Sequence, residues 1–378
     1  MTGIISKPGT HDKLRILSED GQYDLACACG TKDQPGRTRG DNGKWIYPIT
    51  LPNGGKSVLF KTLMSNVCTN DCKYCPLREN VDLRRCSLSA EETASAFMDY
   101  YRRKEVFGLF LSSAVAKSPD ATMSKLNTVA SILRKKHKFR GFIHLKIMAG
   151  ASKAAIEQSL SLASAVSLNI ETAGKENMAK LSAKKDYISD IIEPIKFISS
   201  VTGKGNRYHR VKQTTQFIVG PAGETDADIV KYMFGLYDRL KMHRIYFSAY
   251  QQQSEDQKIQ SAPQPQKPED TFTREHRLYQ VDFLFRKYGF TQSDIACDKN
   301  GNLSLQADPK QVWATNHPEF FPVNVNKAHR NDLLKIPGIG PVTAKKIISH
   351  RKSENLNSIS DIGKDGAILR KAIPYLKF

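Results

Sequence analysis

The sequence lacks any apolar run long enough to cross a membrane as a helix, so we expect no membrane partner. Its first residues, MTGIISKPGTHDKLR, also lack the apolar stretch of a secretory signal, which indicates a cytoplasmic protein. The seven cysteines are few for 378 residues, and their number is odd. Four of them are scattered and fit free thiols better than a disulfide framework: Cys27, Cys29, Cys86 and Cys297.

Acidic residues are scarce relative to basic ones. Lys and Arg number 57 against 38 Asp and Glu, which gives a formal net charge of +19. A strongly basic protein attracts polyanions, and nucleic acid is the first candidate partner. A lysine-rich organism or an ordinary solvated surface would give the same balance, so charge alone leaves the partner open.

Three cysteines lie together in the stretch VCTNDCKYCPL (67–77), with the spacing C-x3-C-x2-C. A structural zinc site closes with four protein ligands, usually supplied as two pairs, whereas Cys68, Cys72 and Cys75 supply three. An iron-sulfur cluster held by three thiolates keeps one iron open for a substrate or cofactor. A zinc site completed by a distant Cys or His, or a chance grouping of thiols, remains the alternative.

This stretch resembles the cysteine motif of the radical S-adenosylmethionine superfamily, including the aromatic Tyr74 before the last cysteine. The resemblance implies that Cys68, Cys72 and Cys75 bind a 4Fe-4S cluster whose free iron chelates S-adenosylmethionine. One-electron reduction would release methionine and a 5′-deoxyadenosyl radical. The resemblance also implies a low-potential electron donor such as flavodoxin or ferredoxin.

Strand-like and helix-like segments alternate after residue 56. Period-two or apolar patterns predict six strands, each followed by a helical pattern, which favours an α/β fold with a parallel sheet closed into a partial barrel. An antiparallel sheet with one solvated face is the alternative. The expected strands are 57–65, 106–113, 141–148, 165–172, 212–220 and 244–250.

The alternation within these strands predicts a polar inner face, because apolar residues share the opposite face. Radical S-adenosylmethionine enzymes share a partial (β/α)6 TIM-like barrel, which the resemblance places at 57–250. It implies a ribose contact for Glu171, an adenine-backing turn at Gly220 in FIVGPAGET, and Ser112 and Ser113 at the turn that receives the methionine amine. The expected cofactor-binding residues are Tyr74, Ser112, Ser113, Lys146, Asn169, Glu171, Gln216 and Gly220.

The remainder of the chain divides around this barrel. Residues 1–56 form an N-terminal segment. Residues 251–272 are rich in Gln and Pro and predict a linker or flap, because they have too few apolar residues for a core. A helical connection (273–325), which contains the helical pattern 274–290, and a C-terminal domain (326–378) complete the expected organisation.

The C-terminal stretch LLKIPGIGPVTAKKIISHR (333–351) resembles a helix-hairpin-helix motif. There the resemblance implies that backbone amides of the hairpin and of the next helix hold a DNA phosphate, a role suited to a helix N-terminus. An ordinary helical corner is the alternative. The expected nucleic-acid-binding residues are Gly338, Ile339, Gly340, Thr343, Lys345, Lys346 and Arg351.

Together the barrel and the hairpin resemble the family of DNA modification or repair radical S-adenosylmethionine proteins. That resemblance includes GQYDLACACG, REHRLYQVDFLFRKYGF and DPKQVWATNHPEFFPVNVNKA. It implies DNA as the substrate and a partner similar to a uracil-DNA glycosylase. An RNA-modifying enzyme of the same superfamily and a non-catalytic iron-sulfur DNA-binding protein are the competing interpretations.

Overall fold

The computed structural model describes residues 8–21, 45–50, 56–250, 268–363 and 366–378. These form two compact units, the first Met1–Glu224 with Asp238–Pro265 and the second Thr225–Tyr237 with Gln266–Phe378. The expectations for Cys27, Cys29 and residues 251–267 lie outside the described residues. Residues 268–272, expected to end the linker, instead begin helix α8 (Pro268–Phe283).

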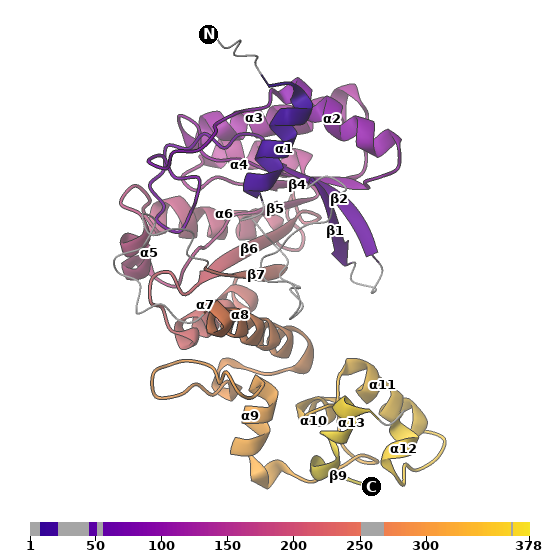
Figure 1. Ribbon diagram of the computed structural model, residues 1–378. Helices are drawn as coiled ribbons and strands as arrows, with labels where there is room; N and C mark the ends of the chain where they lie inside the picture. The colour runs from indigo at the N-terminus through magenta and orange to yellow at the C-terminus, as the bar shows by residue number, and fades with distance from the viewer. Residues whose placement is uncertain (1–7, 22–44, 51–55, 251–267, 364–365) are drawn as a thin grey trace, which may run out of the picture. The chain divides into compact units, whose positions relative to one another are not determined.

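The first unit is built on a seven-stranded sheet in the order β1 to β7 (Figure 1). Strands β2 to β7 are parallel and follow chain order, and β1 pairs antiparallel with β2 at one edge. The parallel pairing confirms the expected α/β fold and excludes the antiparallel alternative. The strands are β1 Ile46–Thr50, β2 Lys56–Leu63, β3 Gly108–Ser112, β4 Phe142–Lys146, β5 Ala165–Ser167, β6 Lys212–Val219 and β7 Arg244–Ala249.

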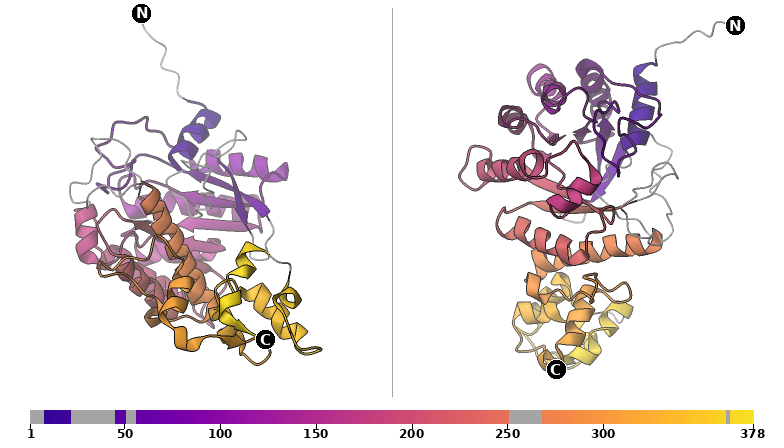
Figure 2. Two further views of the ribbon diagram at one scale, coloured as in Figure 1. Left: turned by 60° about the horizontal axis from the view of Figure 1, so that its bottom comes forward. Right: turned by 90° about the vertical axis from the view of Figure 1, so that its left-hand side faces the viewer.

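Helices connect successive parallel strands, as the sequence predicts. Helix α2 begins with a capping box between Ser89 and Glu92, and Ser118 and Ser152 cap α3 and α4. Each of these helices buries apolar side chains, such as Phe97, Leu126 and Ile156, on its inner face. Figure 2 shows the helices beside the sheet. The helices up to β7 are α1 Thr10–Asp20, α2 Ala90–Arg102, α3 Pro119–Ser131, α4 Lys153–Leu162, α5 Lys175–Leu181, α6 Glu193–Thr202 and α7 Asp226–Asp238.

The register of the sheet brings the ends of neighbouring strands together. Leu63 at the end of β2 pairs with Ser112 at the end of β3, and Lys146 at the end of β4 pairs with Ser167 at the end of β5. Because parallel strands end at the same edge, the segments after them share that edge. It is the edge at which ligands usually bind in parallel α/β folds.

The second unit is mainly helical. Its C-terminal part has a core that includes Leu333, Leu334, Ile339, Ile347 and Leu356. Strands β8 (Val323–Asn324) and β9 (Leu376–Lys377) pair in parallel, so the last residues return to the start of this part. The expected small helical C-terminal domain is confirmed. Its further helices are α9 Pro309–Asn316, α10 Arg330–Lys335, α11 Pro341–His350, α12 Ile359–Ile362 and α13 Ala367–Arg370, and η5 (Leu284–Tyr288) extends α8.

Candidate active site and candidate nucleic-acid-binding hairpin

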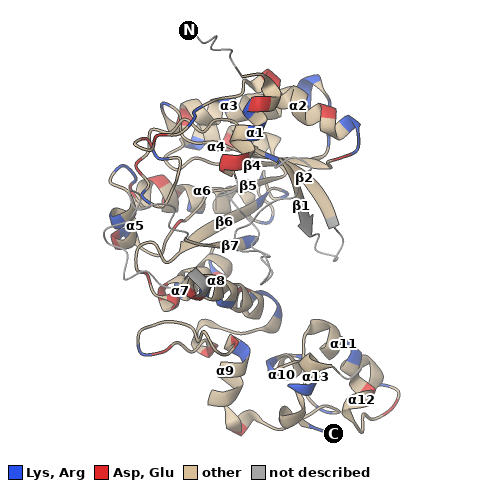
Figure 3. Cartoon of the chain, viewed as in Figure 1, with Lys and Arg blue, Asp and Glu red and all other residues tan. Residues whose placement is uncertain are grey.

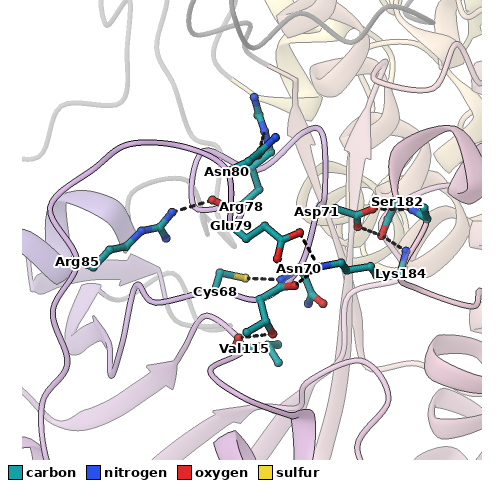
Figure 4. A network of polar contacts seen from close by, with 12 residues as sticks. Cys68, Asn70, Asp71, Arg78, Glu79, Asn80, Arg85, Val115, Ser182 and Lys184 are labelled. Atoms are coloured by element: carbon teal, nitrogen blue, oxygen red, sulfur yellow. Dashed lines mark hydrogen bonds and ion pairs between the residues drawn. The ribbon is translucent and has the colours of Figure 1, made fainter.

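The three clustered cysteines lie on an irregular loop that follows β2, and one arginine organises it. The half-buried guanidinium of Arg85 turns toward the loop (Figure 4). It donates hydrogen bonds to four backbone carbonyls of the loop, which lie outside helices and strands. Arg85 therefore fixes the path of the backbone around the thiols. Its nitrogens donate to the carbonyl oxygens of Asn66 (2.5 Å), Leu77 (2.8 Å), Arg78 (2.7 Å) and Val81 (3.0 Å).

Asn66 holds the start of this loop. Its side chain is fully buried, and its Nδ2 donates to Asp20 Oδ2 at 2.7 Å and to the Arg84 carbonyl at 2.8 Å. Its Oδ1 accepts from the Cys86 N–H at 2.7 Å. The amide thus joins α1, the cysteine loop and the returning chain.

The segment after α5 ties down the other side of the loop. Asp71 accepts hydrogen bonds from the Ser182 hydroxyl and from the Ala183 N–H at 2.9 Å (Figure 4). Lys184 Nζ donates to the Thr69 carbonyl at 2.8 Å and to Glu79 Oε1 at 2.5 Å. Burial alone would raise the pKa of Asp71, but its hydrogen bonds from Ser182 and Ala183 outweigh burial and lower that pKa.

The thiols themselves are close enough to interact electrostatically. Cys72 is buried, and Cys68 and Cys75 accept N–H bonds at 3.4 Å from Asn70 and Leu77. Burial, together with the charges of Cys72 and Cys68, raises the pKa of Cys75 to about 12. A site that gathers three thiols on one loop and opposes the ionisation of Cys72 and Cys75 suits a positively charged metal centre.

The three thiols can be compared with the donor sets that zinc and an iron-sulfur cluster need. Within the described residues, no set of three or more His, Cys, Asp or Glu is placed to hold one metal ion. A single zinc ion needs its ligands around one point, whereas a 4Fe-4S cluster binds each thiolate through a different iron and spreads them farther apart. Three thiolates are the donor set that a 4Fe-4S cluster with one open iron would take.

Lys185 is a component of this site that the sequence analysis missed. Its side chain is 11% exposed, and Nζ lies 4.0 Å from Glu171 Oε1 and 3.3 Å from the Tyr74 hydroxyl. Burial alone would lower the pKa of Lys185, but Cys72 and Glu171 outweigh it and raise that pKa. The site therefore holds a buried ammonium cation beside the thiols.

Glu171 is held by its backbone as well as by Lys185. Its φ of +66° is rare for a residue with a side chain, and such strain is frequent at functional sites. Its N–H donates to the Gln216 carbonyl at 3.0 Å, and its carbonyl accepts from Ile218 at 2.7 Å. Asn169 Nδ2 contacts Glu171 Oε2 at 3.4 Å. The expected Glu171, Asn169 and Gln216 therefore lie together.

The turn after β6 has the geometry that its glycines suggested. Gly220 and Gly223 adopt φ values of +100° and +75°, which glycine accepts without strain. Glu224, buried at 3% exposure, accepts from the Gly220 N–H at 2.5 Å and from the Ala222 N–H at 3.0 Å. Glu224 therefore shapes the turn from within.

The remaining expected residues end β3 and β4. The Ser112 carbonyl accepts from the Met64 N–H at 2.8 Å, so this serine braces the end of β2. The Ser113 hydroxyl donates to the Ala114 carbonyl at 2.7 Å. Lys146 ends β4 with a partly exposed side chain. All three occupy the strand-end edge that carries the cysteine loop.

In the second unit, α10 and α11 form a helical hairpin around the PGIG sequence. Gly338 has φ +83°, and a Cβ there would lie 2.3 Å from the Ile368 carbonyl oxygen. Gly340 is the N-cap of α11 with φ −106°, and a Cβ there would meet the Tyr288 hydroxyl at 3.4 Å. Gly338 is therefore required by packing against α13, whereas Gly340 sits in a more open place.

The expected phosphate-binding side chains differ in their surroundings. Lys345 and Lys346 are exposed on α11, and Thr343 is in its first turn with a partly buried side chain. Figure 3 shows basic residues in blue on α11. Arg351 instead donates to the Val325 carbonyl at 2.9 Å and the Ala328 carbonyl at 2.7 Å. We therefore expect Arg351 to act mainly by holding the hairpin to β8.

A family model described as a helix-hairpin-helix motif matches residues 320–367. This range contains the α10–α11 hairpin and α12, and it ends at the first residue of α13. No curated protein matches the chain. Among the described residues, no helix has both the length and the apolar character needed to span a bilayer.

Solved structures similar to this chain include HydG, PylB and TsrM, of which TsrM is described as a radical S-adenosylmethionine methyltransferase. The hydrogenase maturase HydG from Carboxydothermus hydrogenoformans has 17% identity and a TM-score of 0.46, and the alignment covers 60% of this chain and 52% of the HydG chain. Methylornithine synthase PylB has 12% identity, a TM-score of 0.45, and 59% aligned to 63%. The methyltransferase TsrM from Kitasatospora setae has 14% identity, a TM-score of 0.39, and 51% aligned to 34%.

The chain thus spans about half of HydG and less than two thirds of PylB. At these TM-scores the similarity is partial. The functional argument therefore rests on the geometry of the site itself.

Proposed function

We propose that this protein is a radical S-adenosylmethionine enzyme that acts on DNA. The observation that carries the proposal is the grouping of Cys68, Cys72 and Cys75 on one braced loop, with Lys185 and Glu171 beside them. Three thiols on one loop, next to a buried cation and a carboxylate, suit a cluster with a polar, zwitterionic cofactor.

Each residue of the site has a distinct part in this proposal. Cys68, Cys72 and Cys75 would hold a 4Fe-4S cluster, which when bound supplies the electron that cleaves S-adenosylmethionine into methionine and a 5′-deoxyadenosyl radical. Lys185 offers a cation to the cofactor's carboxylate. Glu171 offers a carboxylate to its ribose hydroxyls, because an anionic oxygen pair can accept from both.

Neighbouring residues complete this proposed cofactor site. Asn169 and Gln216 keep Glu171 in position through their contacts with its side chain and backbone. Gly220 lets the backbone approach the adenine closely, since it carries no Cβ. Tyr74 supplies an aromatic face beside Lys185. Ser112, Ser113 and Lys146 share the same edge of the sheet.

The hairpin supports DNA as the substrate class. Its match to the helix-hairpin-helix model, its exposed Lys345 and Lys346, and the basic charge of the whole chain suit a phosphate backbone. We further propose that a flavodoxin or ferredoxin reduces the cluster, and that a protein similar to a uracil-DNA glycosylase acts with this chain.

Anaerobic reconstitution followed by incubation with S-adenosylmethionine and a reductant tests the enzymatic part. We expect about four iron atoms per chain and release of 5′-deoxyadenosine. An iron-loaded protein that never cleaves the cofactor would instead be a non-catalytic DNA-binding protein. Binding to duplex DNA and to transfer RNA should then be compared, since preference for RNA would overturn the substrate class.

The reaction on DNA is tested in cells. Nucleosides digested from DNA of cells with and without the protein are compared by mass spectrometry. We expect one nucleoside to be lost or to accumulate. Identical nucleoside profiles, in cells that make the iron-loaded protein, would overturn the proposed action on DNA.

A further inference from the structure

Lys310, in the first turn of α9, is buried against the back of the hairpin. It is 9% exposed, its Nζ donates to the Ile339 carbonyl oxygen at 2.5 Å, and the Tyr288 ring centroid lies 4.8 Å from Nζ. Lysines are seldom this buried unless a specific contact compensates the loss of water. Here the compensating contact is made to the PGIG turn.

The groups that face Lys310 come from three elements. On its own helix, the N-cap Asp308 attracts the ammonium group, while Asp308 Oδ1 accepts from the Gln311 N–H. Tyr288 faces it from η5, and the hairpin contributes the Ile339 carbonyl. Lys310 therefore has one carboxylate and one carbonyl to balance its charge.

The contact acts on the peptide group between Ile339 and Gly340. In a trans peptide the N–H points opposite to the C=O, so an oxygen held toward Lys310 directs the Gly340 N–H away from it. Among the described residues, this N–H donates to no backbone carbonyl. A cation on the oxygen also polarises the peptide and strengthens its N–H as a donor.

We propose that Lys310 is a positioning residue of the hairpin: protonated, it orients and polarises the Ile339–Gly340 peptide for a nucleic-acid phosphate, so that binding is coupled to proton uptake at this lysine. The inference rests on the proposed function of the hairpin. It differs from the roles of Lys345 and Lys346, because a buried ammonium releases no counterions from the nucleic acid.

The sign of the pH dependence follows from the environment of Lys310. Burial lowers the pKa of Lys310 to about 7, against the attraction of Asp308. A bound phosphate favours the charged form and raises this pKa above its value in the free protein, so binding takes up a proton. Affinity is then complete below about pH 7 and falls as pH rises through the pKa of the bound state.

The test measures duplex DNA binding by the full chain, by fluorescence anisotropy, at pH 6.0, 7.0 and 8.5 and at several salt concentrations. We expect Lys310→Met to bind about five-fold more weakly than the unaltered protein at pH 6.0, the difference between a charged and a neutral hydrogen bond, and equally at pH 8.5. Its salt slope should be unchanged. Histidines titrate in the same range, so variants are compared at each pH.

Two further variants keep the test decisive. Lys310→Arg stays charged at every pH used, and it should retain the tight binding at pH 8.5. Lys299→Met removes the same charge from an exposed position of the second unit and should follow the unaltered protein at each pH. Circular dichroism at each pH establishes that all variants are folded.

The two possible failures have different signatures. If Lys345→Ala with Lys346→Ala weakens binding but Lys310→Met leaves both affinity and pH profile unchanged, the positioning role is wrong and the hairpin assignment stands. If the double lysine variant binds as the unaltered protein does, the proposed hairpin function fails, and the inference fails with it.

Discussion

In the cysteine loop the proposed ligand groups are side chains, whereas in the α10–α11 hairpin most of them are backbone amides. Both segments are nevertheless held by an arginine that binds carbonyls, Arg85 with four and Arg351 with two. In both sites an arginine orders irregular backbone, but the groups proposed to bind the ligand are side chains in the first and mostly backbone amides in the second.

This difference predicts how each site tolerates change. A site made of side chains loses its chemistry when one ligand is replaced, because no neighbour supplies another thiolate. A site made of amides keeps its donors under most substitutions and responds gradually to changes in nearby charge. The expected effects therefore decrease from the thiols to the surface lysines.

The largest effect should follow loss of one thiol. Cys72→Ala should abolish both cluster absorbance and 5′-deoxyadenosine formation, and iron should fall from about four per chain to near zero, since two thiolates cannot retain the cluster. Cys297→Ala, which removes a thiol from the other unit, should leave both unchanged. Full activity of the Cys72→Ala protein would disprove the central assignment.

The next largest effect should follow loss of Arg85, which orders the cysteine loop but is not a proposed ligand. Arg85→Met removes bonds to four carbonyls, and we expect the free energy of unfolding to fall by about 2 to 4 kcal/mol, with reduced iron uptake. Thermal or denaturant unfolding and iron analysis measure both quantities. The exposed neighbour Arg84 gives a matched control, because Arg84→Met removes the same charge.

If Arg85→Met were as stable and as iron-loaded as the Arg84→Met protein, Asn66 and Asp71 would suffice to order the loop. The cysteine loop would then not depend on its arginine, and the similarity that we draw between the two segments would not hold. Such a result would leave the cluster assignment intact, since that depends on the thiols.

The elements that the sequence predicted are those with local signals. Strand patterns located β2, β3, β4, β6 and β7 to within a few residues. The edge strand β1 was missed, because its IYPIT sequence is short and contains a proline. The expected strand 165–172 is shorter, since β5 ends at Ser167.

Local sequence patterns could not identify the residues that complete the site. Lys185 contacts Tyr74 across 111 positions of sequence, and Ser182 reaches Asp71 across the same separation. Nothing in the spacing around KKDY distinguishes Lys185 from its neighbour Lys184. Arg85 likewise resembles any arginine of a basic chain, since only the folded loop shows the carbonyls that it binds.

A smaller effect should follow the loss of charge at Glu171. Glu171→Gln should keep the cluster but weaken S-adenosylmethionine binding by about 1 to 3 kcal/mol, because a neutral amide replaces an anionic acceptor. Equilibrium binding to the reconstituted protein measures this change. Glu193→Gln, at an exposed position of the same unit, is the control. Unchanged affinity would make Glu171 only the structural partner of Lys185.

The smallest effect should come from the surface of the hairpin, where Lys345 and Lys346 are exposed on α11. If about four phosphates are neutralised, the logarithm of affinity should fall with the logarithm of salt concentration at a slope near −3.6. Lys345→Ala with Lys346→Ala should flatten this slope by up to about two units, weakening binding at low salt and little at high salt. A control with Lys287→Ala and Lys299→Ala removes two exposed charges of the same unit outside the hairpin, and should leave the slope unchanged. Equal slopes for the two double variants would mean that the basic charge acts diffusely and that α11 does not face the phosphates.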